Sequence, residues 1–171
     1  GAQRRHCPDA NTDAAATRQH SQHEIVLTRQ LPVPLGWYCR YGPSVNTRRL
    51  VAEEGGFLYD SDSYADELPF WQTVEGKPHL VLPYSLTNND GKYAGTVGTS
   101  DDWFDFVKDA FDTLYEEGKT QPKMMSVGLH MRLIGHPARS AGLKRLLDYI
   151  SNKKEVCVTR RNDIANHWLK T

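Results

Sequence analysis

Apolar positions along the chain recur at two different periods, one typical of helices and the other of short strands. The helical period is clearest over residues 100–117, where Phe104, Val107, Phe111 and Leu114 are separated by 3, 4 and 3 positions. Helices are also predicted at residues 47–54, 140–152 and 161–169, and a weaker helical pattern covers residues 14–30. Short apolar runs predict strands near residues 35–39, 57–59, 80–83, 124–130 and 155–158. Such alternation is typical of an α/β protein with a mainly parallel sheet.

The predicted strand at residues 124–130 is the main indication of a functional site, because polar side chains follow it directly. The stretch MMSVGLHMR presents His130 and Arg132 at its C-terminal end. In α/β folds, ligands and catalytic groups lie at the C-terminal ends of strands. The other predicted strands end in polar groups too: Arg40, then Asp60 and Asp62, then residues 88–90. We therefore expect these side chains to converge on one rim.

Carboxylates, an imidazole and guanidinium groups on one rim suit the hydrolysis of an amide or an ester. A base activates water, a cation stabilises the oxyanion, and an acid protonates the leaving nitrogen. His130 suits the acid or base role, since a histidine ordinarily titrates near neutral pH. Two structural alternatives stay open. His130 can serve the fold alone, and Asp60, Ser61 and Asp62 can form a hydrogen-bonded turn.

Composition narrows the class of protein. The chain has 171 residues, which suggests one domain, and 39% hydrophobic with 25% charged residues is ordinary for a soluble globular protein. Twenty-one basic residues balance 21 acidic ones, so no nucleic-acid partner is expected. No apolar run is long enough to span a membrane, and the first residues lack the apolar core of a signal peptide. The three cysteines have no CxxC spacing, which favours reduced thiols and a cytoplasmic location.

The N-terminal segment differs in character from the rest of the chain. Residues 1–30 are polar, with only the weak helical pattern noted above, so we expect a boundary there and one domain over residues 31–171. His20 and His23 lie three positions apart and would share a helix face. They can form a metal-binding pair or belong to a solvated helix surface.

Several stretches together resemble one known family. They are GWYCRYGPSVNTRRLVAEEGGFLYDSDSYADELPFW, KPHLVLPYSLTNND, FVKDAFDTLYEEG, PKMMSVGLHMRLIGHPAR and RRNDIANHW. They are similar to the C-terminal part of the PuuE-type allantoinases, the cofactor-independent members of the polysaccharide deacetylase (NodB-like) superfamily. The resemblance covers roughly residues 35–169.

This resemblance implies the C-terminal portion of a distorted (β/α) barrel, activity on a small ureide, and no cofactor or metal. The implied reaction opens the cyclic amide of (S)-allantoin to allantoate in purine breakdown. The late histidine motif of the superfamily falls on His130, and its aspartate-bearing segment falls on Asp60 and Asp62. We therefore expect His130, Asp60 and Asp62 to be catalytic, and Trp37, Tyr38, Arg40, Asn89 and Arg132 to bind the substrate.

The sequence also departs from the family pattern. The early acidic residues of the family are missing, and its paired-histidine segment has no counterpart; His6 is followed four positions later by Ala10. We therefore expect an incomplete barrel in which the strand at residues 35–39 has an unpaired side, and a homo-oligomer as the consequence. A metal-dependent carbohydrate N-deacetylase and a non-catalytic partial-barrel module remain the alternative functions.

Overall fold

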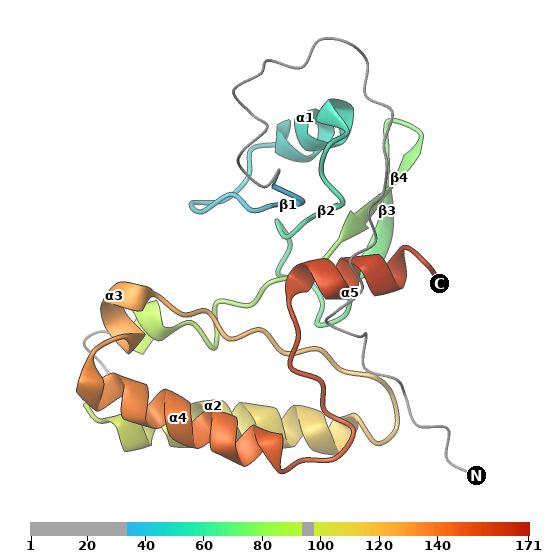
Figure 1. Cartoon of the computed structure of the whole chain (residues 1–171). Coiled ribbons are helices and arrows are strands. Elements are labelled where there is room, and N and C mark those ends of the chain that lie inside the picture. The colour runs from blue at the N-terminus through green and yellow to red at the C-terminus, as the bar shows by residue number, and fades with distance from the viewer. Residues whose placement is uncertain (1–33, 94–97) are drawn as a thin grey trace.

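The computed structural model describes residues 34–93 and 98–171. Within these residues, four strands form one sheet in the order β1 (Gly36–Trp37), β2 (Tyr59–Asp60), β4 (Lys77–Val81) and β3 (Phe70–Val74). β1, β2 and β4 are parallel, and β3 pairs with β4 antiparallel. The helices are α1 (Thr47–Glu54), α2 (Ser100–Glu117), α3 (Met131–Ile134), α4 (Pro137–Ser151) and α5 (Arg161–Trp168), and the 3-10 turn η2 covers Asp90–Tyr93. The described part is thus an α/β fold with a mixed sheet, as Figure 1 shows.

The predicted helices are confirmed, each within a few residues of its expected bounds. α2 illustrates the reason, since its apolar positions at helical spacing bury Trp103, Val107 and Phe111. Its first turn is fixed by a capping box in which Thr99 accepts from the backbone of Asp102 and the Asp102 side chain accepts from the backbone of Thr99. The weak helix at residues 14–30, with His20 and His23, lies outside the described residues.

The strands agree less well with the expectation. Those at residues 35–39, 57–59 and 80–83 correspond to β1, β2 and β4 with shifted or shortened bounds. β3 was not predicted; it forms a hairpin with β4 through a turn at Glu75 and Gly76, both with positive φ. This turn has glutamate where asparagine or aspartate is the usual signal, and the middle of β3 is exposed rather than alternately buried.

Two predicted strands are wrong. Residues 124–130 make a single parallel bridge, between Gly128 and Asn89, and residues 155–158 form no strand within the described chain. The apolar runs are present, but a strand is defined by continuous hydrogen bonding to a neighbour. Sequence pattern cannot tell whether the fold supplies that neighbour.

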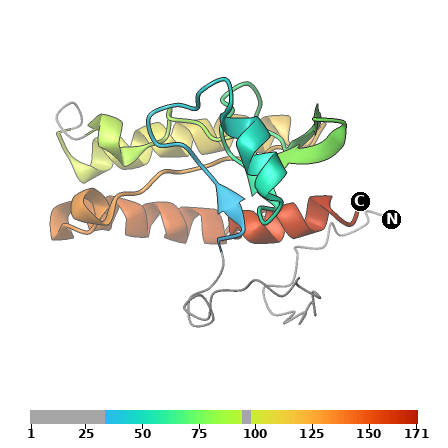
Figure 2. The same cartoon turned by 90° about the horizontal axis from the view of Figure 1, so that it is seen from above.

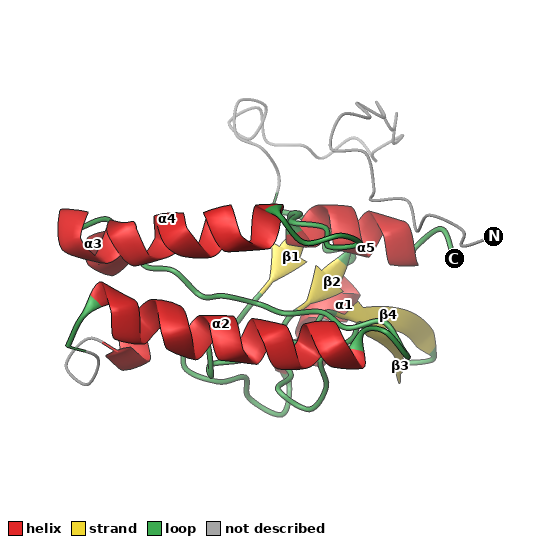
Figure 3. Cartoon of the chain, turned by 90° about the horizontal axis from the view of Figure 1, so that it is seen from below, coloured by secondary structure: helices red, strands yellow, loops and turns green. Residues whose placement is uncertain are grey.

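Two apolar clusters hold the described elements together. One joins β2 and β4 to α5 through Tyr59, Leu80, Leu82 and Ala165. The other joins α2, α3 and α4 through the side chains Trp103, Val107, Ile134 and Leu146. In the views from above and below, α4 and α5 lie along one side and α2 runs beside α4 (Figures 2 and 3).

The close approach of α2 and α4 depends on a glycine. A Cβ at position 142 would lie 2.7 Å from the backbone oxygen of Ser100 and 3.3 Å from Cε3 of Trp103. Gly142 therefore lets the two helices meet at the N-terminal end of α2, which is where the site described below begins.

The cysteines correct one expectation. Cys39 is free, but Cys157 is disulfide-bonded, so the prediction of reduced thiols is wrong at Cys157. Disulfide bonding depends on which cysteines the fold brings together, and sequence spacing does not show this. Cys7 lies outside the described residues. None of the described helices has the length and apolar character needed to cross a membrane.

Candidate active site

A histidine and a buried carboxylate form a tight pair at the centre of the site. The Nδ1 atom of His130 lies 2.6 Å from Oδ1 of Asp90. The backbone N–H of His130 also donates to this carboxylate, at 2.9 Å from Oδ2 and 3.1 Å from Oδ1. The Asp90 side chain is 4% exposed, whereas that of His130 is 34% exposed. The imidazole is thus held at one nitrogen and from its own backbone, while part of the ring faces solvent.

A short parallel contact between residues 88–90 and residues 128–130 positions the His130–Asp90 pair. The N–H of Asp90 donates to the carbonyl of Gly128 at 2.9 Å, and the N–H of Gly128 donates to the carbonyl of Asn88 at 3.2 Å. Position 128 has no room for a side chain, since a Cβ there would lie 2.2 Å from the Tyr84 hydroxyl. The sequence therefore brings residues 88–90 and 128–130 together only because glycine stands at this crossing point.

A second carboxylate, Asp60, is the centre of a buried ionic cluster. Arg48 of α1 donates to it through Nε at 2.7 Å and through Nη2 at 3.1 Å. Nε2 of His79 in β4 lies 2.8 Å from Oδ2 of Asp60, and the N–H of Asp62 donates to Oδ1 at 2.9 Å. Both Asp60 oxygens are thus occupied, and the side chain is 1% exposed.

The surroundings of Asp60 change its ionisation. Burial acts to raise the pKa of this carboxyl, but the hydrogen bonds from His79, Arg48 and the backbone of Asp62 lower the pKa to about 2. Asp60 is therefore a permanent anion at neutral pH that joins α1, β2 and β4. A carboxylate engaged on all sides in this way is suited to holding a site in place.

The neighbouring Asp62 has the opposite character. Its Oδ1 accepts from the backbone N–H of Cys39 at 2.6 Å, and its buried Oδ2 has no hydrogen-bond partner. Burial, aided by the charge of Asp60, raises the pKa of Asp62 despite the opposing Cys39 hydrogen bond. Asp62 is thus the carboxyl in this region with an oxygen left for another group.

Aromatic side chains connect the region of Asp62 to that of His130. The hydroxyls of Tyr38 and Tyr64 lie 3.0 Å apart, and the rings of Tyr38 and Tyr84 meet edge to face at 5.2 Å. The Tyr84 hydroxyl accepts from Nδ2 of Asn89 at 2.6 Å. Burial and the Tyr64 contact raise the pKa of Tyr38, so its hydroxyl stays protonated. Tyr38 and Asn89 therefore belong to one continuous face between the two carboxylate groups.

The other predicted binding residues lie further out. Trp37 is 38% exposed and packs edge to face on Phe57 at 5.5 Å. Arg40 is exposed, with its guanidinium over the Tyr41 ring at 4.9 Å. Arg132 is exposed on α3. The side chain of Trp37 acts on the Asp62 carboxyl, where it partly opposes the rise in the pKa of that group. Arg40 and Arg132 make no hydrogen bond to the described part of the two carboxylate clusters.

Sequence reasoning missed the partners that define these clusters. Arg48 and His79 were not singled out, and Asp90 was noted only as a polar residue after a strand. Arg48 looks like an ordinary charged position of a surface helix. His79 directly precedes the apolar run at residues 80–82, which is the one signal that was available. Within residues 34–93 and 98–171, no three metal-ligating side chains gather into a metal site. His6 lies outside those residues.

Comparison with known proteins identifies relatives of this chain. No protein-family model matches the chain. A Schizosaccharomyces pombe protein assigned to the polysaccharide deacetylases is 42% identical over 152 residues, which is 79% of this chain and 47% of that protein.

Solved structures agree with this relationship. The crystal structure of PuuE allantoinase matches with a TM-score of 0.74 and 54% identity, over 81% of this chain and 47% of the other. A Pseudomonas aeruginosa PAO1 protein assigned as a polysaccharide deacetylase matches with a TM-score of 0.74 and 52% identity, over 80% of this chain and 47% of the other. This chain thus spans about half the length of these proteins, and over about four fifths of its own length it is related to PuuE allantoinase and to the polysaccharide deacetylases.

Proposed function

We propose that this chain carries part of the active site of an allantoinase-like hydrolase, which opens the cyclic amide of (S)-allantoin to allantoate in purine breakdown. The observation that carries the proposal is the pairing of a half-exposed imidazole, His130, with a buried carboxylate, Asp90. The likeness to PuuE allantoinase at 54% identity directs the choice of substrate.

In this proposal, His130 acts in proton transfer to the leaving amide nitrogen. When the Nδ1–H donates to Asp90, the proton-accepting nitrogen of the neutral ring is Nε2, on the side away from the carboxylate. Asp90 also stabilises the positive charge when the ring is protonated. Amide nitrogens leave poorly unless they are protonated, so a positioned acid contributes a large share of the rate.

The two other carboxylates have separate roles in this proposal. Asp60 keeps β2 and its neighbours in place, because both of its oxygens already accept hydrogen bonds from neighbouring groups. Asp62 is the group that acts on substrate or water, because its Oδ2 has no partner. Tyr38 and Asn89 line the path between Asp62 and His130 and contact the ureide.

The chain spans 47% of the length of each of the two structurally similar proteins. The form of the protein used to measure turnover therefore matters. We propose that residues 31–171 form part of a NodB-type barrel and that the complete site includes residues from the remaining portion. Turnover therefore needs to be measured both on this chain and on a chimera in which the first half of PuuE allantoinase precedes it.

The test is the substitution His130→Asn in the form of the protein that turns over allantoin. Asparagine keeps some hydrogen bonding but does not titrate, so turnover should fall on the order of 100- to 10,000-fold. His136→Asn is the matched control, since His136 is an exposed residue that precedes α4 and should tolerate the change. Near-normal turnover of His130→Asn, with a melting curve like that of the parent, would contradict the assignment.

A metal-dependent carbohydrate N-deacetylase is the second candidate, because two of the similar proteins are assigned as polysaccharide deacetylases. It predicts release of acetate from oligomers of N-acetylglucosamine that depends on added divalent metal. Measuring acetate release and allantoin turnover on the same preparation separates the two functions.

A further inference from the structure

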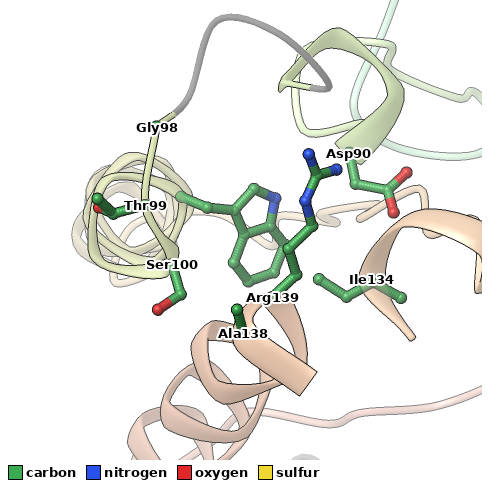
Figure 4. Close-up of a pocket in the computed structure, with 8 residues that line it drawn as sticks. Asp90, Gly98, Thr99, Ser100, Ile134, Ala138 and Arg139 are labelled. Carbon is green, nitrogen blue, oxygen red and sulfur yellow. The ribbon is translucent and has the colours of Figure 1, made fainter. Parts of the chain in front are cut away.

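The nitrogen of His130 that can reach a substrate lies away from Asp90. Nδ1 faces the Asp90 carboxylate, so Nε2 stands on the other side of the ring. A cavity of about 360 Å³ adjoins Asp90, and Arg139 extends beside this carboxylate from α4 (Figure 4). His130 is not among the described residues that line the cavity. Groups that assist a reaction at Nε2 therefore lie outside it.

Asn89 borders the free edge of the imidazole. A Cβ at position 91 would lie 2.8 Å from Oδ1 of Asn89 and 3.3 Å from Cε1 of His130, the ring carbon bonded to Nε2. The orientation of the amide is fixed at both ends. Its Oδ1 accepts from the backbone N–H of Gly91 at 2.8 Å, and its Nδ2 donates to the Tyr84 hydroxyl at 2.6 Å. The amide thus connects the hydroxyl of Tyr84 to the edge of His130.

Tyr84 and Asn89 each keep one hydrogen-bond donor unused. The Tyr84 oxygen accepts from Asn89, which leaves the phenolic proton to be donated. Within residues 34–93 and 98–171, neither this proton nor the second N–H of the Asn89 amide has an acceptor. A Cβ at position 128 would lie 2.2 Å from the hydroxyl and 2.5 Å from Nδ2. Glycine at position 128 therefore leaves both donors uncovered by the segment that carries His130.

The ring of Tyr84 is held firmly in this position. The Tyr38 ring meets it edge to face at 5.2 Å, and the guanidinium of Arg161 lies 6.0 Å from its centre. Its backbone N–H donates to the carbonyl of Ser63 at 2.9 Å. The hydroxyl is thus oriented in advance, and the cation beside the ring favours negative charge close to the hydroxyl.

We infer that the Tyr84 hydroxyl and the free N–H of Asn89 form an oxyanion hole, which binds the oxygen of an amide carbonyl under attack. The inference rests on the proposed function for the reaction and adds Tyr84 to it as a catalytic residue. Two neighbouring donors without acceptors are suited to an oxygen that gains negative charge, and hydrogen bonds of this kind strengthen as the charge develops.

The proposed step balances with water as the second reactant. Attack by water forms a C–O bond and moves the π electron pair of the carbonyl onto its oxygen, while the proton of the water passes to Asp62. Collapse of the tetrahedral intermediate returns that pair to the carbonyl and breaks the C–N bond, and the leaving nitrogen takes a proton from His130. Tyr84 and Asn89 transfer no proton, because they act as hydrogen-bond donors throughout.

The experiment compares Tyr84→Phe with the parent in the form of the protein that turns over allantoin. Phenylalanine keeps the ring and removes the hydroxyl, so kcat should fall about 100-fold or more while KM changes little. The pH profile should keep its shape, since His130 is unchanged. Tyr149→Phe is the matched control, because it removes a hydroxyl that donates to Asp112 between α4 and α2, and kcat should stay at the parental value.

The kinetic constants decide the inference. A parental kcat in Tyr84→Phe, in a variant with a parental melting curve, overturns it. A raised KM with an unchanged kcat also overturns it, because that is the result of a role in binding alone. If Tyr84→Phe does not fold, Asn89→Asp decides, since it keeps an acceptor for Gly91 and removes the N–H donor, and an unchanged kcat in that variant overturns the inference.

Failure of the proposed function would look different. If the parent releases acetate from oligomers of N-acetylglucosamine and does not turn over allantoin, the proposed function is refuted. A 100-fold fall of acetate release in Tyr84→Phe would then uphold the inference, because an N-acetyl group has the same carbonyl chemistry. Allantoin turnover with parental kinetics in Tyr84→Phe refutes the inference alone, and a protein that hydrolyses neither amide refutes both.

Discussion

At the scale of single residues, the two buried carboxylates, Asp60 and Asp90, have different roles. Asp60 is held by Arg48 of α1, His79 of β4 and the backbone of Asp62, and its pKa is lowered to about 2. Asp90 holds His130 at both its ring and its backbone N–H. The first arrangement stabilises a charge inside the protein. The second orients a group that can exchange a proton, and this difference leads to two predictions.

The first residue-scale prediction concerns Asp60 and acid stability. Its folded pKa of about 2 lies below its ordinary value of 3.8, so its contribution is complete above about pH 4 and is lost as the pH falls toward 2. The loss should be roughly 1–2 kcal/mol of the free energy of unfolding, after allowance for solvent screening. Denaturant unfolding between about pH 5 and pH 2.5 measures it, and Asp60→Asn should lack this part of the pH dependence. A variant with the same acid sensitivity as the parent would contradict the prediction.

The second residue-scale prediction concerns Asp90. In Asp90→Asn the amide replaces an anionic acceptor, so the variant no longer stabilises a protonated His130 and no longer selects the Nδ1–H tautomer. Turnover of allantoin by the active form should fall on the order of 100- to 10,000-fold, with an altered pH profile. If Asp90→Asn keeps both its rate and its pH profile, the pair serves the fold and not the chemistry.

At the scale of elements, α5 is joined to the rest of the fold by the half-buried Arg161 as well as by its apolar contacts with β2 and β4. Arg161 donates to the carbonyls of Leu82 and Pro83 beyond β4 and to the hydroxyl of Ser126. Burial lowers the pKa of this guanidinium, which shows how far it is removed from solvent. One side chain thus ties the last helix to two segments far away in the sequence.

The element-scale prediction follows from these bonds. Arg161→Met keeps the length of the side chain and leaves buried carbonyls without donors, so the free energy of unfolding should fall by about 2–4 kcal/mol. Arg160→Met is the control, because Arg160 pairs with Asp163 at an exposed position, and its loss should destabilise the fold much less than the loss of Arg161. Denaturant melts of both variants give the comparison. Equal losses in the two would refute the anchoring role of Arg161.

At the scale of the whole molecule, the described sheet is open at β1. β1 pairs with β2 on one side only, and Trp37, Tyr41 and Val45 in and after it are exposed. An edge strand of this kind has unpaired backbone groups that can bind another chain.

We therefore predict that this chain self-associates. Light scattering across a concentration series should show a mass that rises with concentration, and Trp37→Lys should shift the distribution toward monomer by placing a charge on the edge. Trp71→Lys, in the antiparallel strand at the other edge, is the matched comparison. A monomer at every concentration would contradict the prediction.

The sequence by itself determined the helices and the family, and tertiary structure decided the rest. The helices predicted at residues 47–54, 100–117, 140–152 and 161–169 correspond to α1, α2, α4 and α5. Local spacing predicts them because a helix makes its hydrogen bonds within itself. The two carboxylate clusters depend on contacts between residues far apart in the sequence. Asp90 contacts His130, forty residues away. Asp60 contacts Arg48 and His79, which belong to two other elements. The apolar run at residues 124–130 predicts a strand but forms a single bridge, because its bonds depend on a neighbour that only the fold can supply.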